Sequence, residues 1–464
     1  MLAPMMKRRD ALKTIGGLGA AAGMARFLPS CGSGDDGPNG ITTYVYLMME
    51  NRSYDHFFGA RSMIEAKPGD GLRTTMTNPD LANQPISPWT PANTQLCAID
   101  PPHGWDASHL QWNNGANDGF VRAHQMEHSD PTAIEPMQYL VRKDVPVSWA
   151  LADQYATADR WFCAVMGPTW PNRFYWHAAT SEGKMANTLP TGGSLIEPSI
   201  YHRLDAKGID WAYYFGNIPV VSLYKGLDTS HIRRFMPDFL VDAAAGKLPP
   251  VVYLDPAFNE NDDHPPVHPI NGQELIATVY TALAQSPQWK NILLVITYDE
   301  HGGFFDHVSP PRTVDARAAQ GFDQLGFRVP TLVAGPYVKQ SYVSSKVYEH
   351  CSALRHLELA FDLEPLNQRT MAASDLSDFI DMDRLARGAW AKPIAIPMVD
   401  PSDMTLWPMS AVCRSGSLRE DHPILEWANA HPDALGALDL RSELPEYRRG
   451  IREFLARASR ALVE

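Results

Sequence analysis

The chain has 464 residues, of which 44% are hydrophobic and 20% charged, as in an ordinary globular protein with room for one large α/β domain or two smaller ones. Its formal net charge of −13 argues against a nucleic acid as partner, because phosphate backbones bind to basic surfaces. The charge does not exclude a small phosphate substrate that is held by a metal cation.

The first 31 residues predict an export signal. Residues 7–13, with Arg8 and Arg9, resemble a twin-arginine signal, and the apolar stretch 14–27 is too short and glycine-rich to span a bilayer. Residues 28–31 resemble the cleavage box of a bacterial lipoprotein, which would anchor the chain to a membrane through Cys31; the alternative is a plain signal that is cut nearby. We therefore expect the twin-arginine export machinery as a partner and a periplasmic, cell-envelope or secreted protein.

After a flexible tether at 32–40, strand-like and helical segments alternate, and this alternation predicts an α/β fold with a mainly parallel sheet and helices on both faces. Residues 41–385 form the predicted main domain, in which 80–135 read as an irregular loop insertion over the site. Residues 386–464 predict an extension that packs on this domain through a helix at 443–462. The predicted strands are 41–49, 209–215, 250–254, 292–298 and 328–334, and the predicted helices are 172–181, 272–285 and 352–363.

Two of these strands end in polar groups that suit a metal ion. The strand 292–298 runs into Asp299-Glu300 and then Gly302-Gly303, which lets backbone approach a ligand closely, and the strand 41–49 runs into Glu50-Asn51. Open α/β sheets hold their ligands at the carboxyl ends of parallel strands, so one site assembled from both ends is predicted. The alternative is that these residues only cap the turns that follow.

A third segment, residues 166–173, places the hydroxyl of Thr169 just before a helix whose first turn contains Pro171. Free N–H groups and positive potential at a helix start favour an attacking alkoxide and an anionic phosphate. A threonine that merely caps the helix is the alternative.

Five cysteines include Cys31, and none of them forms a Cys-x-x-Cys pair, so neither a zinc ribbon nor a redox pair is predicted. In an oxidising compartment, one or two disulfides among the other four are compatible with the sequence; buried free thiols are the alternative. These four are Cys97, Cys163, Cys351 and Cys413.

Several motifs occur together in an order that resembles one known family. They are ENRSYDHFFG at 50–59, GPTWPNR at 167–173, YDEHGGFFDH at 298–307, RVP at 328–330, YEHCSALR at 348–355 and LNQR at 366–369. The combination resembles the bacterial phosphoesterase family of phospholipases C and a branch of acid phosphatases, over about residues 41–380.

The resemblance implies an alkaline-phosphatase-like α/β fold and a hydrolase of phosphoric esters. It implies that one divalent metal ion is bound by Glu50, Asn51, Asp299 and Glu300, with Thr169 as a further ligand and as the nucleophile. Oxygen ligands favour Ca²⁺, Mg²⁺ or Mn²⁺, with Zn²⁺ as an alternative.

The resemblance also assigns His103 and His264 to positions that contact the phosphate, where histidine is suited to donate and accept protons. Candidates for further substrate contacts are Trp170, Asn172, Arg173, His301 and His350. Two residues depart from the family pattern: Trp170 replaces a usual polar residue, and Glu349 a frequent aspartate. Aromatic residues near the motifs suggest a cage for a choline headgroup, with core packing as the alternative. These residues are Tyr54, Trp105, Trp112, Trp161 and Trp170.

The leading expectation is therefore an exported phospholipase C that forms a phospho-threonine intermediate on Thr169 and acts on a phospholipid. An acid phosphatase that acts on monoesters is the close rival, because both activities use the same core. A lipoprotein that binds phosphorylated ligands without turnover is the alternative from another class. A sulfatase is disfavoured, since the Cys-x-Pro-x-Arg or Ser-x-Pro-x-Arg element that generates formylglycine is not found.

Overall fold

A computed structural model describes residues 40–92, 95–190, 194–397, 399 and 440–461 of the chain. Its centre is an eight-stranded sheet in the order β11-β4-β10-β9-β1-β8-β6-β7. In that order the strands are Tyr342–Ser344, Ala156–Ala158, Thr331–Ala334, Ile292–Tyr298, Thr43–Met49, Val251–Asp255, Trp211–Phe215 and Ile232–Arg234.

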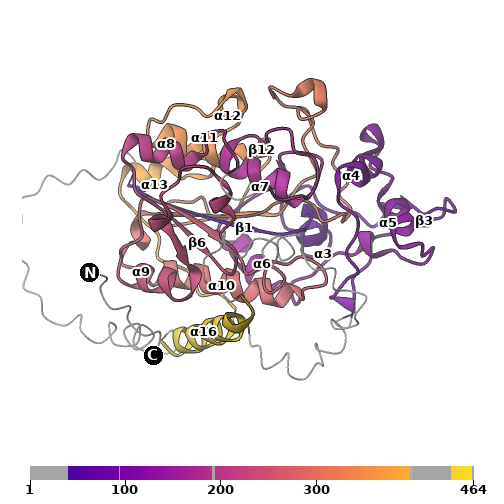
Figure 1. Cartoon of the computed structure of the whole chain (residues 1–464). Helices are drawn as coiled ribbons and strands as arrows, with labels where there is room; N and C mark the ends of the chain where they lie inside the picture. Colours follow the sequence, from indigo (N-terminus) through magenta and orange to yellow (C-terminus); the bar gives the residue numbers. More distant parts are fainter. Residues whose placement is uncertain (1–39, 93–94, 191–193, 398, 400–439, 462–464) are drawn as a thin grey trace, which may run out of the picture.

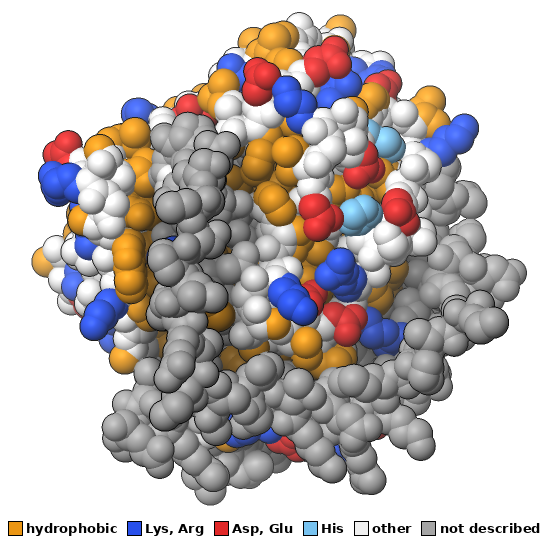
Figure 2. Space-filling model, turned by 90° about the vertical axis from the view of Figure 1, so that its left-hand side faces the viewer, with side chains coloured by type: hydrophobic (Ala, Val, Ile, Leu, Met, Phe, Trp, Pro, Cys, Tyr) orange, Lys and Arg blue, Asp and Glu red, His pale blue; other side chains and the backbone are white. Residues whose placement is uncertain are grey.

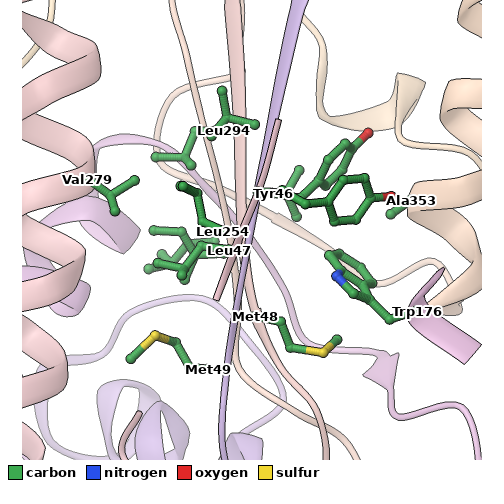
Figure 3. Packing of buried hydrophobic residues seen from close by; sticks show 14 of the residues in the cluster. Tyr46, Leu47, Met48, Met49, Trp176, Leu254, Val279, Leu294 and Ala353 are labelled. Carbon is green, nitrogen blue, oxygen red and sulfur yellow. The ribbon is translucent and has the colours of Figure 1, made fainter. Parts of the chain in front are cut away.

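The two central strands form because continuous apolar runs are stable in a sheet that is covered on both faces. Every residue of β1 and of β9 is buried. Side chains alternate along β1, so that Leu47 and Met49 point to the side of Val279 in α10 (Pro269–Ala284), whereas Tyr46 and Met48 point to the opposite side (Figure 3). The strands therefore hold two helical layers apart.

Helices cover both faces of the sheet, as predicted. On one face α10 packs against α6 (Pro146–Gln154), α9 (Leu240–Ala244) and α16 (Leu440–Ala461). On the other face α7 (Thr169–Ala178) packs against α8 (Ile200–Lys207) and α11 (Cys351–Ala360), and α11 packs against α12 (Gln368–Ala372) (Figure 1). Smaller elements are α2 (Tyr54–Phe57), α3 (Gly59–Glu65), α13 (Met382–Ala386) and the strands β2 (Asn78–Pro79), β3 (Pro85–Ile86), β5 (Trp161–Phe162) and β12 (Tyr348–Glu349).

The predicted α/β class is confirmed, and several details differ. The strands β1, β6, β8 and β9 lie where the sequence predicted them and pair in parallel, but β10 is antiparallel to both of its neighbours. The short strands β4, β7 and β11 were not predicted, because three residues are too few for a periodic signal. The segment 80–135 is not irregular throughout: it contains α4 (Trp105–Trp112) and α5 (Phe120–His128).

The helix α16 contributes Tyr447, Ile451 and Phe454 to the main hydrophobic core. Cys163 and Cys351 are free and buried, and Cys97 is disulfide-bonded, so the two buried thiols are not paired with each other. The predicted signal, Cys31 and Cys413 lie outside the described residues.

Side chains of both charges are interspersed among apolar ones on the face that Figure 2 shows. Among the helices of the described segments, none combines the length and the apolar character needed to cross a bilayer.

Candidate active site

Sheet geometry brings the two predicted strand ends together. Because β1 and β9 are parallel neighbours with Met49 opposite Tyr298, Glu50 and Asp299 follow at the same edge of the sheet. The backbone N–H of Asn51 donates to Asp299 Oδ1 at 3.1 Å. Gly302 is required for this approach, since a Cβ there would lie 2.2 Å from the carbonyl oxygen of Asn51 and the residue has φ +62.

The helix α7 places Thr169 at this edge. It begins at Thr169 and not at residue 172, so that the hydroxyl lies in the first turn instead of before it. Thr169 and Arg173 are one helical turn apart and share a face of α7. Arg173 Nε donates to Asp299 Oδ2 at 3.2 Å and Arg173 Nη2 to the carbonyl of Met49 at 3.2 Å, which ties the start of α7 to the strand ends.

The donor set fits a divalent cation. Within the described part of the chain, three fully buried side-chain oxygens at this edge have no hydrogen-bond partner, namely Asn51 Oδ1, Thr169 Oγ1 and Glu300 Oε1. Buried polar atoms normally have a partner, so three orphaned oxygens in one predicted ligand set indicate a binding site for a cation. Amide, hydroxyl and carboxylate oxygens are ligands of Ca²⁺, Mg²⁺ and Mn²⁺.

The electrostatics of the edge also fit a cation. Burial and the neighbouring carboxyl of Asp299 raise the pKa of Glu50 to about 8. Burial also raises the pKa of Asp299 and, by much more, that of Glu300. The guanidinium of Arg173 bonds Asp299 at 3.2 Å and is shared with Asp255 at 3.1 Å. A bound divalent ion would favour the ionised carboxylates.

Two histidines form the partly exposed side of the site. His103 Nε2 lies 3.3 Å from Asn51 Nδ2 and 4.0 Å from Glu300 Oε1, and its ring is 5.8 Å from that of His264. Asp100 faces both, at 3.7 Å from His103 Nδ1 and 3.8 Å from His264 Nε2. The exposed fractions of the three side chains are 11% for His103, 13% for His264 and 36% for Asp100, so a ligand reaches the edge past this group.

Backbone carbonyls orient both histidine rings. His103 Nδ1 lies 2.8 Å from the carbonyl oxygen of Pro101, and His264 Nδ1 lies 2.6 Å from that of Pro265. A carbonyl only accepts, so Nδ1 of each ring donates and Nε2 is the atom that gains or loses a proton. Burial lowers the pKa of His103, but Glu300 and Asp100 outweigh burial and raise it to about 9.

The other predicted contacts with the substrate stay predictions, and most of these residues use polar groups in hydrogen bonds inside the protein. Asn172 Nδ2 donates to the carbonyls of Gly167 and Pro168 and so holds the turn before Thr169. His350 Nε2 lies 2.6 Å from the carbonyl of Asp299, and His301 lies between Glu300 and Gln111. These residues, with Arg173 and the buried Trp170, form the walls of the site and position its ligands.

The predicted aromatic cage is not assembled. Trp161 stacks on Tyr348, Trp170 packs on Phe258, and the guanidinium of Arg328 covers Tyr54. Trp112 bonds Ser309 at the far end of α4. Trp105 alone of the five is half-buried beside the turn before Thr169, where a Cβ on Gly167 would lie 3.1 Å from its ring.

Sequence reasoning missed the acidic residues that follow β8. Asp255 ends this strand and bonds Arg173, and the carboxyl groups of Asp262 and Glu50 are hydrogen-bonded. The signal was available in the sequence, because the predicted strand 250–254 is followed directly by Asp255 and then by the run Asp262-Asp263. The rule that acidic residues directly after a buried strand mark a ligand site would have identified these residues as well.

A second acidic cluster lies beside the site and is internally neutralised. Arg328 Nε donates to Asp306 Oδ1 at 2.8 Å and Arg328 Nη2 to Asp55 Oδ1 at 3.1 Å. His307 bonds Asp55 through Nδ1 at 2.6 Å and Asp70 through Nε2 at 3.1 Å. This cluster, which we call the Arg328 cluster (Asp55, Asp70, Asp306, His307 and Arg328), joins the segment after β9 to α2.

The fold and the site thus define an α/β protein with an oxygen-rich ligand site at the carboxyl edge of parallel strands. Residues 41–364 match the family model of the Phosphoesterase family, and the chain belongs to this family. It is a hydrolase that acts on phosphoric ester bonds, with a phosphate ester as its substrate.

Curated relatives carry phospholipase names. The chain is 32% identical over 402 residues to non-specific phospholipase C6 of Arabidopsis thaliana, which covers 79% of this chain and 76% of the relative. It is 30% identical over 424 residues to phospholipase C A of Mycobacterium tuberculosis, covering 77% and 81%.

Solved structures with a related arrangement include a lipoteichoic acid synthase from Listeria monocytogenes, 10% identical with a TM-score of 0.39 over 74% of this chain and 75% of that one. A protein in the alkaline phosphatase superfamily from Vibrio parahaemolyticus is 10% identical, with a TM-score of 0.38 over 80% and 79%.

Proposed function

We propose that this protein is an exported, metal-dependent phospholipase C that cleaves phospholipids to diacylglycerol and a phosphorylated headgroup through a phospho-threonine intermediate. The observation that carries the proposal is the buried hydroxyl of Thr169 without a hydrogen-bond partner among the described residues, beside orphaned oxygens of Asn51 and Glu300. The phospholipase names of relatives at about 30% identity support the substrate class.

Glu50, Asn51, Thr169, Asp299 and Glu300 would hold the metal ion. When bound, a divalent cation neutralises a phosphate oxygen and lowers the pKa of a coordinated hydroxyl. Ca²⁺, Mg²⁺ and Mn²⁺ suit these oxygens, and Zn²⁺ is the alternative.

In the first step, the Thr169 hydroxyl releases its proton to water, Oγ1 attacks the phosphorus in line, and the bond from phosphorus to the diacylglycerol oxygen breaks. The leaving oxygen takes a proton from a histidine Nε2, and His264 and His103 are the two residues whose Nε2 atoms are set for this role by their Nδ1 contacts. In the second step, water attacks the phosphorus and gives a proton to the histidine Nε2 that donated in the first step, and the bond to Thr169 breaks. The phosphorylated headgroup leaves, and Thr169 Oγ1 regains a proton from water.

Export is proposed from the twin-arginine-like segment at 7–13, with lipidation of Cys31 as one route to membrane anchoring. The disulfide of Cys97 supports an oxidising compartment, because disulfides persist there and are rare in the cytosol.

The test compares the hydrolysis of p-nitrophenyl phosphorylcholine with that of p-nitrophenyl phosphate in the presence of Ca²⁺, Mg²⁺, Mn²⁺ or Zn²⁺. We expect preference for the diester, no activity in Thr169→Ala, and partial activity in Thr169→Ser, which keeps a hydroxyl. Protein that is acid-quenched during hydrolysis of the diester should carry phosphorylcholine on Thr169 by mass spectrometry.

Preference for the monoester would instead make the protein a phosphatase on the same core. If neither ester is cleaved with any of the metals, the non-catalytic binding protein becomes the better reading and the mechanism fails.

A further inference from the structure

We propose that the C-terminal helix α16 is a positioning element of the active site, in which Tyr447 fixes Asn261 and thereby the loop 256–264 that carries Asp262 and His264. The inference rests on the proposed function for the roles of Glu50 and His264. The helix lies outside residues 41–364, the part that matches the family model, so the match assigns it no role.

The helix α16 packs firmly against the main domain. Tyr447, Ile451 and Phe454 of α16 are buried in the main core, and the ring of Tyr447 lies 6.0 Å from that of Phe235. Ion pairs tie the exposed side to the body of the protein: Arg448 pairs with Glu260, and Arg452 Nε lies 3.9 Å from Glu274 Oε1. The helix is therefore fixed in place along the loop and α10.

Tyr447 of α16 contacts the loop 256–264 through Asn261. Asn261 has an exposed fraction of only 6%, and its Nδ2 donates to Tyr447 Oη at 3.1 Å. Its Oδ1 accepts from the backbone N–H of Ala257 at 2.9 Å, and its own N–H donates to the carbonyl of Ala257 at 3.1 Å. The Asn261 side chain thus closes the turn 257–261, and Tyr447 holds that side chain from outside.

Asp262 connects the loop 256–264 to the active site. Asp262, the next residue, is fully buried; its Oδ1 accepts from the N–H of His264 at 3.1 Å, and its carbonyl oxygen accepts from the N–H of Glu50 at 2.8 Å. Its carboxyl is also hydrogen-bonded to that of Glu50. One residue therefore sets the positions of a proposed metal ligand and of a proposed proton donor.

The chain Tyr447, Asn261, Asp262 is continuous, and each link is a hydrogen bond or a peptide bond. A loop that loses its outer hydrogen bond gains conformational freedom, and displacement of catalytic groups by about 1 Å is costly to the rate. Because Tyr447 touches neither Glu50 nor His264 in these contacts, its effect is on position and not on chemistry.

The experiment uses the full chain with Tyr447→Phe, which removes the hydroxyl and keeps the ring. We expect kcat to fall about five-fold with KM within two-fold, which corresponds to about 1 kcal/mol on the barrier. Phe454→Leu is the matched control: this side chain is buried on the same helix, and the variant should lower the melting temperature at least as much while keeping kcat.

Asn261→Ala and the double variant that combines it with Tyr447→Phe complete a double-mutant cycle. The double variant should lose no more kcat than Asn261→Ala alone, because both changes break the same link. An unchanged kcat in Tyr447→Phe, additive losses, or an equal kcat loss in Phe454→Leu would each overturn the positioning role.

A second readout separates this proposal from the proposed function. Mn²⁺ binding is measured by electron paramagnetic resonance, with Tyr447→Phe expected to weaken it about three-fold through Glu50 and Phe454→Leu to leave it unchanged. If the wild-type protein hydrolyses neither ester, the proposed function has failed, and the Mn²⁺ affinities alone decide the role of α16: weakening supports it and equal affinities overturn it.

Discussion

Two groups of buried carboxylates lie side by side in this protein and are built from the same two motifs, yet they differ in how their charge is balanced. In the Arg328 cluster, a buried guanidinium and an imidazole bond Asp55 and Asp306. At the strand ends, the guanidinium of Arg173 bonds Asp299 and is shared with Asp255, and Glu300 Oε1 has no hydrogen-bond partner among the described residues.

The difference shows that burial of acids is not itself the signature of a metal site. A carboxylate group that the chain neutralises with its own cations is structural, whereas one that is left short of cations and of hydrogen-bond donors fits an external cation. We therefore expect substitutions at the strand ends to lower activity more than stability, and substitutions in the Arg328 cluster to lower stability first.

The largest expected effect is on activity at the strand ends. Glu300→Gln removes a proposed metal ligand and should lower kcat by about 10⁴-fold, since a metal contributes several kcal/mol to charge stabilisation in the transition state. In the presence of EDTA, the same variant should melt no lower than the wild type, because it replaces a buried carboxylate whose Oε1 has no hydrogen-bond partner among the described residues. Full activity would show that the strand ends do not hold the metal.

Breaking the Arg328 cluster should act on stability first. Arg328→Gln leaves Asp55 and Asp306 buried without their main cation and should lower the free energy of unfolding by about 3–5 kcal/mol, measured by urea denaturation. Arg312→Gln is the matched control, because Arg312 pairs with Asp323 at the surface with an exposed fraction of 67% and should change stability by less than about 1 kcal/mol. Equal effects in the two variants would contradict the contrast.

Metal removal sharpens the comparison further. At a free metal concentration 100 times its dissociation constant, chelation should lower the free energy of unfolding of the wild type by about 2.7 kcal/mol. Glu300→Gln should show a much smaller loss, whereas the loss in Arg312→Gln should match the wild type. A wild type whose melting curve is unaffected by EDTA would argue against a bound metal.

The smallest effect concerns a third buried acid, Glu274, which faces Arg452 of α16. Burial raises its pKa from 4.5 to about 7 in the folded protein, and Arg452 offsets part of this. The unfolded chain releases this proton at lower pH than the folded protein does. The free energy of unfolding therefore falls as pH rises from about 4.5 to about 7, and the loss stays constant above about pH 7.

Glu274→Gln should therefore raise the free energy of unfolding by about 1–2 kcal/mol at pH 8 and leave it unchanged at pH 4. Urea denaturation at the two pH values measures the difference. As a control, Glu453→Gln on α16, with an exposed fraction of 47%, should change stability by less than about 0.5 kcal/mol at either pH. A gain that is equal at pH 4 and pH 8 would exclude titration of Glu274 as its cause.

Much of the sheet could be predicted from the sequence because its central strands are continuous apolar runs. Each of β1 and β9 carries its signal within seven residues, and the polar residues that follow mark the strand end. Strands of three residues, such as β4 and β11, carry no such signal and exist only because neighbouring strands offer them hydrogen bonds.

The sequence by itself determined the chemistry at the strand ends: the acids after β1 and β9, the hydroxyl at Thr169 and the motifs that mark the phosphoesterase family. Only the tertiary structure decided which polar groups remain open to a ligand. Asn172, Arg173 and His350 resembled substrate contacts in the sequence, but the fold uses their hydrogen bonds internally, whereas Asn51, Thr169 and Glu300 keep an oxygen without a partner among the described residues. The residue type determines which groups a side chain is able to bind. Long-range packing determines whether that side chain already bonds another group of the protein.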